Sequence, residues 1–255
     1  GLFRSGGRSS AGVCYQYAGI LSLVTIVGMR LSIIIPALNE AANIAATLQP
    51  LQAMRARGVE VIVVDGGSSD ATRSIAAPLA DRVVDSPRGR AKQMNAGARG
   101  ASGDVLLFLH ADSLLPADGD EWVARALAEA RFDWGRFDVN ISGSHFMFPV
   151  IAWFMNHRSR LTGIATGDQG IFVRRTVFER IDGFADQPLM EDINLCARLL
   201  NESPPVYVSG ARIVTSGRRW EKHGVWRTIF LMWRLRLNYY CGASPESIHR
   251  AYYGK

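Results

Sequence analysis

Charged and polar side chains directly follow several apolar runs of this sequence. The run Val105–Leu109 leads into His110 and Asp112, and the run Val61–Val64 leads into Asp65. The segment "PRGRAK" adds three cations after a further short run, namely Arg88, Arg90 and Lys92. Cations that open a helix can hold a diphosphate together with the backbone N–H groups, although a solvated surface carries the same pattern. Whether these groups meet depends on the elements that carry them.

Those elements alternate between strand and helix patterns. Short apolar runs rich in β-branched residues predict strands at 31–36, 59–65, 81–86 and 104–109. Apolar residues at helical spacing predict helices between the strands, the first capped by Asn39 and the second by Ser69 or Asp70. This alternation predicts an α/β fold with a mostly parallel sheet, right-handed crossovers and flanking helices.

The predicted topology brings the polar residues together, because ligands bind beyond the carboxyl ends of such strands. Those ends carry residues 36–40, 65–70, 88–92 and 110–112, so one edge of the sheet gathers acidic and basic groups. Two kinds of site are disfavoured there. A phosphohydrolase needs a second Asp two positions after Asp65, where Gly67 stands. A nicotinamide site needs Gly-x-Gly-x-x-Gly, where "PALNE" follows the first strand.

The second half of the chain is less regular. A helix is expected at 188–200, with the carboxylates of Glu191 and Asp192 in its first turn, where the helix dipole favours them. The aromatic segment 145–161 is expected to be a helix packed in the core. Segment 224–240 mixes apolar residues with arginines. Its apolar residues lie on many sides, which favours packing on the core or on a dimer partner over a helix lying on a membrane.

Composition predicts one domain. A chain of 255 residues with 48% hydrophobic residues can bury a single core, and no linker interrupts residues 29–255, which include C-terminal helices from about 224. Its 29 Lys and Arg against 23 Asp and Glu favour anionic partners. The three cysteines are too scattered for a zinc site or a disulfide framework, so a cytoplasmic location is expected. Residues 1–28 are interpreted as an extension outside the fold rather than as an anchor.

Six fragments together resemble a known family. They are "SIIIPALNEAANI", "VIVVDGGSSDAT", "GRAKQMNAGA", "LLFLHADS", "FVRR…IDGF…LMEDINLCARL" and "SGRRW". Their order and spacing between Met29 and Trp220 are similar to those of family 2 glycosyltransferases of the GT-A fold. The resemblance implies an enzyme that moves a sugar from a UDP-sugar, with UDP-GlcNAc or UDP-Glc favoured, and that inverts the anomeric centre.

The resemblance also implies roles for individual residues. Pro36, Glu40 and Asp65 would surround the uracil and ribose, while Arg88, Arg90 and Lys92 would lie near the base or the phosphates. Asp168 and Gln169 of "TGDQG" are candidates for contacts to sugar hydroxyls. Asp192 matches the acceptor-side general base of the family, with Glu191 beside it. On the acceptor side we expect Arg158, Arg218, Arg219 and Trp220.

The match departs from the family at several positions. His110 replaces the first Asp of Asp-x-Asp, so the divalent metal, Mn²⁺ or Mg²⁺, is expected on Asp112 with His110 as a further ligand or a hydrogen-bond donor to the diphosphate. Gly66 stands where the family often has a second acidic residue. Ser216 replaces the glutamine of the Gln-x-x-Arg-Trp element, which disfavours processive polymer synthesis.

Within this family, "HADS", "TGDQ", "PLMED" and "RRWEKHGVWRTIFLMWRLRLNYY" resemble the short branch associated with radical-SAM and selenium-related proteins. That branch includes selenosugar synthases, so the resemblance implies selenophosphate as an anionic acceptor. A hydroxyl or a lipid phosphate is the alternative acceptor, and nucleotidyl transfer or a sugar-nucleotide-binding module without turnover is the alternative function. Neither nucleic acid nor a membrane is expected as a partner, whereas a homodimer is.

Overall fold

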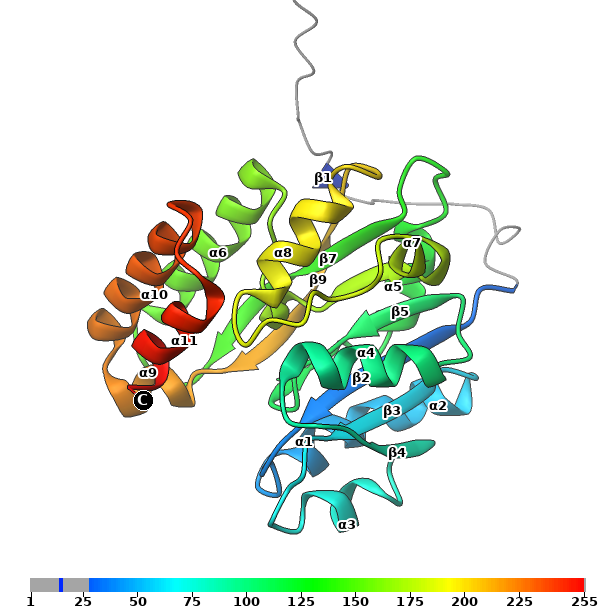
Figure 1. Ribbon diagram of the computed structural model, residues 1–255. Coiled ribbons are helices and arrows are strands. Elements are labelled where there is room, and N and C mark those ends of the chain that lie inside the picture. Colours follow the sequence, from blue (N-terminus) through cyan, green and yellow to red (C-terminus); the bar gives the residue numbers. More distant parts are fainter. Residues whose placement is uncertain (1–13, 16–27, 255) are drawn as a thin grey trace, which may run out of the picture.

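The computed structural model describes residues 14–15 and 28–254. Their strands form one sheet in the order β1-β9-β7-β8-β5-β2-β3-β4, with β6 paired to β9 (Figure 1). The strands are β1 Cys14–Tyr15, β2 Leu31–Ala37, β3 Glu60–Asp65, β4 Arg82–Asp85, β5 Val105–Phe108, β6 Ser113–Leu114, β7 Trp134–Ser142, β8 Ile171–Arg174 and β9 Val206–Ser216. Pairing is antiparallel where β8 meets β5 and β7 and where β6 meets β9, and parallel elsewhere.

Helices connect the strands and cover the sheet. The α-helices are α1 Ile44–Leu48, α2 Gln52–Ala56, α3 Thr72–Ala76, α4 Arg90–Gly100, α5 Gly119–Ala126, α6 Phe148–Thr162, α7 Arg175–Arg180, α8 Glu191–Leu199, α9 Arg218–His223, α10 Val225–Tyr240 and α11 Pro245–Tyr253; the 3₁₀ turns are η1 Gln49–Leu51 and η2 Gly167–Gln169. The predicted α/β architecture with a mostly parallel sheet is confirmed. None of the helices in these described ranges is long and apolar enough to cross a bilayer.

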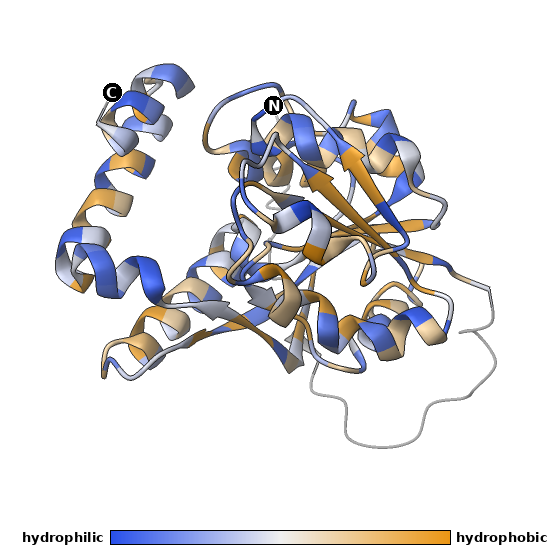
Figure 2. Ribbon diagram, turned by 90° about the horizontal axis from the view of Figure 1, so that it is seen from below, coloured by the Kyte–Doolittle hydropathy of each residue, from blue (hydrophilic) through white to orange (hydrophobic). Residues whose placement is uncertain are grey.

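The sheet has a hydrophobic cluster on each of its two faces. Along β2, Ile33 and Ile35 join the hydrophobic cluster that also contains Leu48 of α1, whereas Ile34 joins the cluster that contains Met94 of α4. Every residue of β2 is buried, which explains why the run is continuously apolar instead of alternating. Figure 2 shows this concentration of apolar residues on the central strands. The packed sheet holds its carboxyl-end loops in place for a site.

The two predicted helix caps are wrong. α1 begins only at Ile44, and Asn39 has a positive φ of 55° with its carboxamide oxygen accepting a hydrogen bond from the N–H of Ser69 at 2.9 Å. α3 begins at Thr72 without a side-chain cap, and the Asp70 carboxylate instead accepts hydrogen bonds from Thr72 and from the N–H of Ala41. Asn39 and Asp70 thus form hydrogen bonds between the loop after β2 and the loop after β3. These contacts between loops take the place of the expected helix caps.

The basic loop is shorter than expected. α4 starts at Arg90, so Arg90 and Lys92 belong to its first turn and only Arg88 precedes it. The chain enters this helix at Gly89, whose φ of 138° disfavours any residue with a side chain. Arg90 is thereby directed from a helix start, not from a mobile loop.

Segments 145–161 and 224–240 form helices that pack on the core with one face each, and the expected dimer partner for 224–240 stays a prediction. Ile151 of α6 and Val225 of α10 are buried in a shared cluster. Opposite faces remain open, with Trp153 of α6 52% exposed and Trp233 of α10 64% exposed. Figure 1 shows α6, α10 and α11 together at one end of the sheet.

The N-terminal segment enters the described structure only in part. Cys14 and Tyr15 pair in parallel with Tyr207 and Val208 of β9, and Gly28 leads into β2. Residues 1–13 and 16–27, to which the interpretation of an extension outside the fold applies, lie outside the described residues, so that interpretation stays a prediction.

Candidate active site

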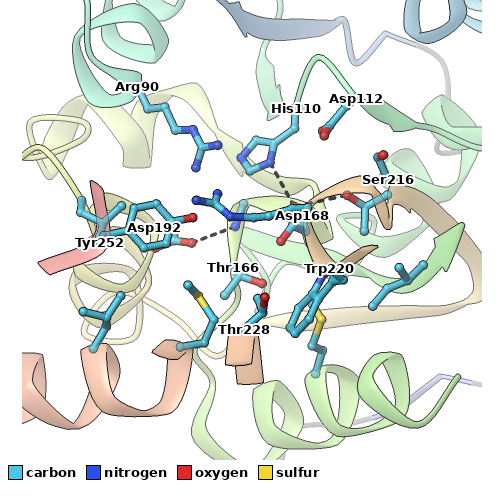
Figure 3. A pocket seen from close by; sticks show the side chains of 18 of the residues that line it. Arg90, His110, Asp112, Thr166, Asp168, Asp192, Ser216, Trp220, Thr228 and Tyr252 are labelled. Carbon is cyan, nitrogen blue, oxygen red and sulfur yellow. Dashed lines mark hydrogen bonds and ion pairs between the residues drawn. The ribbon is translucent and has the colours of Figure 1, made fainter. Parts of the chain in front are cut away.

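A cavity of about 500 Å³ lies at the carboxyl ends of the central strands, lined by residues that include the start of α4, α9 and α10 (Figure 3). Ten of the residues selected from the sequence line it: Glu40, Arg90, His110, Asp112, Asp168, Glu191, Asp192, Arg218, Arg219 and Trp220. They come from segments that lie up to 180 positions apart in the chain, from Glu40 to Trp220. The sheet edge therefore gathers these charged groups as the topology predicts.

His110 and Asp168 form a pair on the wall of the cavity. The imidazole Nδ1 lies 3.1 Å from the Asp168 Oδ1, and the hydroxyl of Thr215 lies 3.3 Å from the same oxygen (Figure 3). Desolvation opposes the charge on Asp168, but the hydrogen bond and charge of His110, together with Arg90, lower its pKa to about 2. Asp168 is therefore ionised across the physiological range.

Two adjacent carboxylates at the start of α8 have different environments. The Asp192 carboxylate accepts hydrogen bonds from the backbone N–H of Gly167 at 2.9 Å and of Ile193 at 2.7 Å, which orients it at the cavity. Glu191 is buried, and burial together with the neighbouring charge of Asp192 raises its pKa, while Arg90 opposes that rise. The residue before them, Met190, has a left-handed φ of 64°, an uncommon conformation that turns the chain into α8 at this point.

Arg90 faces these carboxylates across the cavity. Figure 3 shows its guanidinium directed toward the centre, between His110 and Asp192. Desolvation works against the charge of Arg90, but Glu191 and Asp168 raise its pKa above the ordinary value. A permanent cation at the start of α4 is suited to a phosphate or diphosphate.

Asp112 is the carboxylate best placed for a metal. Its side chain is 31% exposed and has Arg218 as a neighbour, with 3.7 Å between Asp112 Oδ2 and the guanidinium. In the described ranges, no group of three or more His, Cys, Asp and Glu side chains could hold a metal alone. Mg²⁺ typically binds one or two carboxylates together with substrate phosphates. Asp112 thus fits a metal that is shared with a diphosphate.

His110 fits the predicted role of metal ligand less well. Its Nδ1 is engaged by Asp168, and its Nε2 packs so closely on Gly167 that a Cβ on that glycine would lie 2.3 Å away. Ligation by Nδ1 would break the contact with Asp168. The arrangement favours the alternative expectation, in which the imidazole supports neighbouring groups through hydrogen bonds.

The side of the cavity formed by α9 and α10 is cationic. It contributes Arg218, Arg219, Lys222, His223 and Arg236, and no Asp or Glu. Arg158 of α6 lies behind this wall. Its Nε and Nη2 are buried and have no hydrogen-bond acceptor within the described part of the chain. Burial and the charge of Arg236 lower the pKa of Arg158 to about 10, and Asp192 opposes the shift.

Three residues expected at the donor have their side chains elsewhere. Pro36 is buried within β2. Asp65 is 4% exposed, and its carboxylate accepts hydrogen bonds from the N–H groups of Gly67 and Ser68, so it holds its own turn together. Gln169 is completely buried and donates to the Ser159 hydroxyl at 3.2 Å. A sugar contact for Gln169 is therefore not supported, because its amide lies in the core.

The remaining cations of the basic loop point away from the cavity lining. Arg88 is exposed, and the ammonium of Lys92 lies 3.6 Å from the carboxylate of Asp186 on the surface. Only Arg90 of the three predicted diphosphate ligands lines the cavity. Nucleotide contacts by Arg88 and Lys92 stay predictions.

Several cavity residues were not selected from the sequence. They include Ile141, Met155, Thr166, Ser216, Lys222, His223, Thr228, Met232, Arg236 and Tyr252. Most are ordinary core or surface types whose position depends on how α10 and α11 fold back on the sheet. Arg236 could not be singled out from the sequence, because Arg227 and Arg234 lie on the same helix and the pattern does not show which side of it is buried.

Comparison with known proteins agrees with this geometry. The glycosyl transferase family 2 model matches residues 32–181, which is more than half of the chain. A PGL/p-HBAD biosynthesis glycosyltransferase of Mycobacterium tuberculosis is 42% identical over 106 residues, covering 38% of this chain and 41% of that protein. Glycosyltransferase AglE of Haloferax volcanii is 32% identical over 173 residues, covering 64% of this chain and 54% of that protein. The chain thus spans about half or less of these relatives.

Solved structures show the same fold. Glucosyl-3-phosphoglycerate synthase from Mycobacterium tuberculosis, in complex with Mn²⁺, UDP and phosphoglyceric acid, superposes with a TM-score of 0.63 at 19% identity, covering 91% of this chain and 86% of that one. Its likeness supports the GT-A arrangement of a mostly parallel sheet with flanking helices. With the matched family model over residues 32–181, the chain belongs to glycosyl transferase family 2.

Proposed function

We propose that the chain transfers a sugar from a UDP-sugar, with UDP-GlcNAc or UDP-Glc favoured, to a small phosphorylated anion, and that selenophosphate is this acceptor. The observation that carries the proposal is the cationic wall formed by α9 and α10. A wall of arginines that contributes no carboxylate would stabilise phosphate oxygens through charge-assisted hydrogen bonds. The buried, unsatisfied guanidinium of Arg158 behind it adds a donor that an anion could satisfy.

The donor would bind along Arg90 and Asp112. Arg90 at the start of α4 would hold the diphosphate, and Asp112, which lies next to Arg218, would hold a divalent metal shared with it. When bound, the metal would supply positive charge for the leaving UDP. The synthase that shares this fold carries Mn²⁺, UDP and an acidic acceptor, phosphoglyceric acid, which gives a precedent for such a pairing of ligands.

The proposed reaction is a single displacement with inversion. The selenium of selenophosphate forms a bond to the anomeric carbon while the bond from that carbon to the UDP oxygen breaks, giving a glycosyl selenophosphate and UDP. No proton has to leave, because the nucleophile is already an anion. The role of Asp192 would then be to orient the cations around the acceptor, and the role of Arg90 to stabilise charge on UDP. The unpaired thiols of Cys196 and Cys241 agree with the proposed cytoplasmic location.

A hydroxyl acceptor is the second candidate, and the placement of Asp192 favours it. Its carboxylate is oriented by two backbone N–H groups and lines the cavity, as a general base for a sugar or alcohol hydroxyl would need to be. Asp192 would accept the hydroxyl proton while oxygen attacks the anomeric carbon.

Mass spectrometry of products from a panel of UDP-sugars tests the proposal. Each donor is incubated with Mn²⁺ and either selenophosphate, inorganic phosphate, phosphoglycerate or a hydroxyl acceptor. A selenium-containing sugar and an equal amount of UDP are expected with selenophosphate. Product with hydroxyl acceptors alone would select the second candidate. Donor binding without turnover on any acceptor would select a binding module, and release of pyrophosphate would select nucleotidyl transfer.

A further inference from the structure

An apolar stripe runs along the outer face of α10. Five large side chains, Trp226, Phe230, Trp233, Leu237 and Tyr240, are each at least 57% exposed. Their spacing of three and four residues places them on one side of the helix. The opposite side packs on the protein through Val225, Thr228 and Leu235. The stripe is therefore a second apolar face that the described chain does not cover.

Cations flank this stripe. Arg227 and Arg234 are exposed next to it on α10, and α10 itself contains no Asp or Glu, whereas the neighbouring α9 and α11 contain Glu221 and Glu246. α6 also leaves apolar residues open, including Trp153 and Phe154. Figure 2 shows the C-terminal helices at one side of the molecule, apart from the sheet.

A groove of about 860 Å³ borders the stripe between α9, α10 and α11. Its lining includes Arg219, His223, Arg227, Phe230, Arg234 and Tyr253, and among the residues that the structure describes it includes no Asp or Glu. Positive charge next to Trp and Tyr side chains is the composition of a surface that binds at the level of anionic lipid headgroups.

We propose that α10 docks the protein on a membrane of anionic phospholipid, with its aromatic stripe at the headgroup boundary and a lipid phosphate in the adjacent basic groove. A second copy of the chain fits less well. A symmetric dimer would place this face on itself, so Arg227 and Arg234 of both copies would meet with no carboxylate from either helix. Anionic lipid supplies the missing charge. Arg219 and Tyr252 line both the cavity and the groove. Docking of the groove on a membrane would therefore bring the cavity close to the lipid.

This proposal goes beyond the sugar transfer and does not depend on the acceptor. Its test is sedimentation of the full chain with vesicles of phosphatidylcholine alone and of phosphatidylcholine mixed equally with phosphatidylglycerol. The wild type is expected to sediment with the mixed vesicles, less so at high salt, and to show a blue shift of tryptophan emission. The combined variant Phe230→Ser, Trp233→Ser and Leu237→Ser is expected to bind at least about tenfold more weakly, because the anchoring apolar area is lost.

Two controls accompany this variant. Leu200→Ser removes an exposed leucine at the C-terminal cap of α8, outside α10, and is expected to bind vesicles like the wild type. Arg227→Gln with Arg234→Gln is expected to lose the preference for phosphatidylglycerol. UDP affinity, measured in each variant, shows that the fold and the cavity are intact.

Three results would overturn the proposal. They are absence of wild-type binding to the mixed vesicles, unchanged binding by the triple variant, and a wild-type dimer in light scattering that the triple variant converts to monomer without any lipid. The last result would assign the stripe to a second copy.

Discussion

The imidazole of His110 and the carboxylate of Asp168 lie 3.1 Å apart, although 58 positions separate them in the chain. The pair joins the loop after β5 to the η2 turn before β8, across the antiparallel contact between these strands. Where the resemblance to Asp-x-Asp suggests a lost carboxylate at position 110, the structure places a different carboxylate beside the replacement. A carboxylate therefore lies beside position 110, although position 110 itself carries an imidazole.

This pair predicts a specific loss of stability in acid. The folded-state pKa of Asp168, about 2, is below the unfolded value of about 3.9. The stabilisation is therefore fully present above about pH 4 and is lost as pH falls toward 2. Asp168→Asn should remove this part of the pH dependence, measured as the urea midpoint between pH 5 and pH 2. The exposed Asp186→Asn variant serves as control, and equal slopes for wild type and Asp168→Asn would contradict the assignment.

Arg90 and Arg88 should differ in their effect on nucleotide binding. Arg90→Ala is expected to weaken UDP binding by about 1.5–3 kcal/mol, as loss of a charge-assisted hydrogen bond does. Arg88→Ala and Lys92→Ala are matched controls from the same segment, and each should change UDP affinity by less than about tenfold. Calorimetric titration with UDP measures all three. A larger loss of UDP affinity in Arg88→Ala than in Arg90→Ala would contradict this assignment and would indicate that Arg88 makes the phosphate contact.

Asp112 should couple metal and nucleotide. In wild type, Mn²⁺ is expected to strengthen UDP binding, and chelation should remove this gain, because Asp112 and the diphosphate would hold the metal together. Asp112→Asn should bind UDP with the same affinity in Mn²⁺ and in chelator. Asp104 lies just before β5, at the end of the strand opposite to Asp112. The control variant Asp104→Asn should keep the effect of Mn²⁺ on UDP binding. Full metal dependence of UDP binding in Asp112→Asn would refute this ligand.

The pH dependence of Asp192→Asn separates the two acceptor classes. With a hydroxyl acceptor, loss of a general base costs about 10²–10⁴-fold, and the deficit shrinks as rising pH supplies hydroxide or ionised acceptor. With selenophosphate, Asp192 acts through orientation and binding, so the deficit should stay constant as pH rises. Initial rates of UDP release for wild type and variant, measured across pH with each acceptor, decide between these behaviours. A deficit with selenophosphate that shrinks with pH would contradict the orienting role.

The sheet could be predicted because its strands are continuously apolar. In β2, the adjacent residues Ile33 and Ile34 pack in different hydrophobic clusters on opposite faces of the sheet. A continuously apolar run therefore indicates that both faces of the strand are covered. The positions of His110, Asp112 and Asp192 in one cavity followed from strand topology and from the family motifs. Strand runs and family motifs are both short segments, and their conformation depends mainly on residues that are near one another in the sequence.

Other features depend on contacts that no local pattern specifies. Asp168 and Gln169 are adjacent, yet one lines the cavity and the other is buried among α6 side chains, because the η2 turn directs them oppositely. Asn39 resembles a helix cap but bonds across to Ser69. The open face of α10 could not be predicted either, since its apolar residues occur on both sides and only the packing shows which side is covered.

The most direct test of the proposed transfer is the NMR spectrum of the product made from a UDP-sugar labelled with ¹³C at the anomeric carbon, in the presence of Mn²⁺ and selenophosphate. The proposal predicts a one-bond coupling between that carbon and ⁷⁷Se, an anomeric configuration opposite to that of the donor, and one UDP for each product formed. An anomeric carbon bonded to oxygen in every product, or a product that keeps the donor configuration, would contradict it.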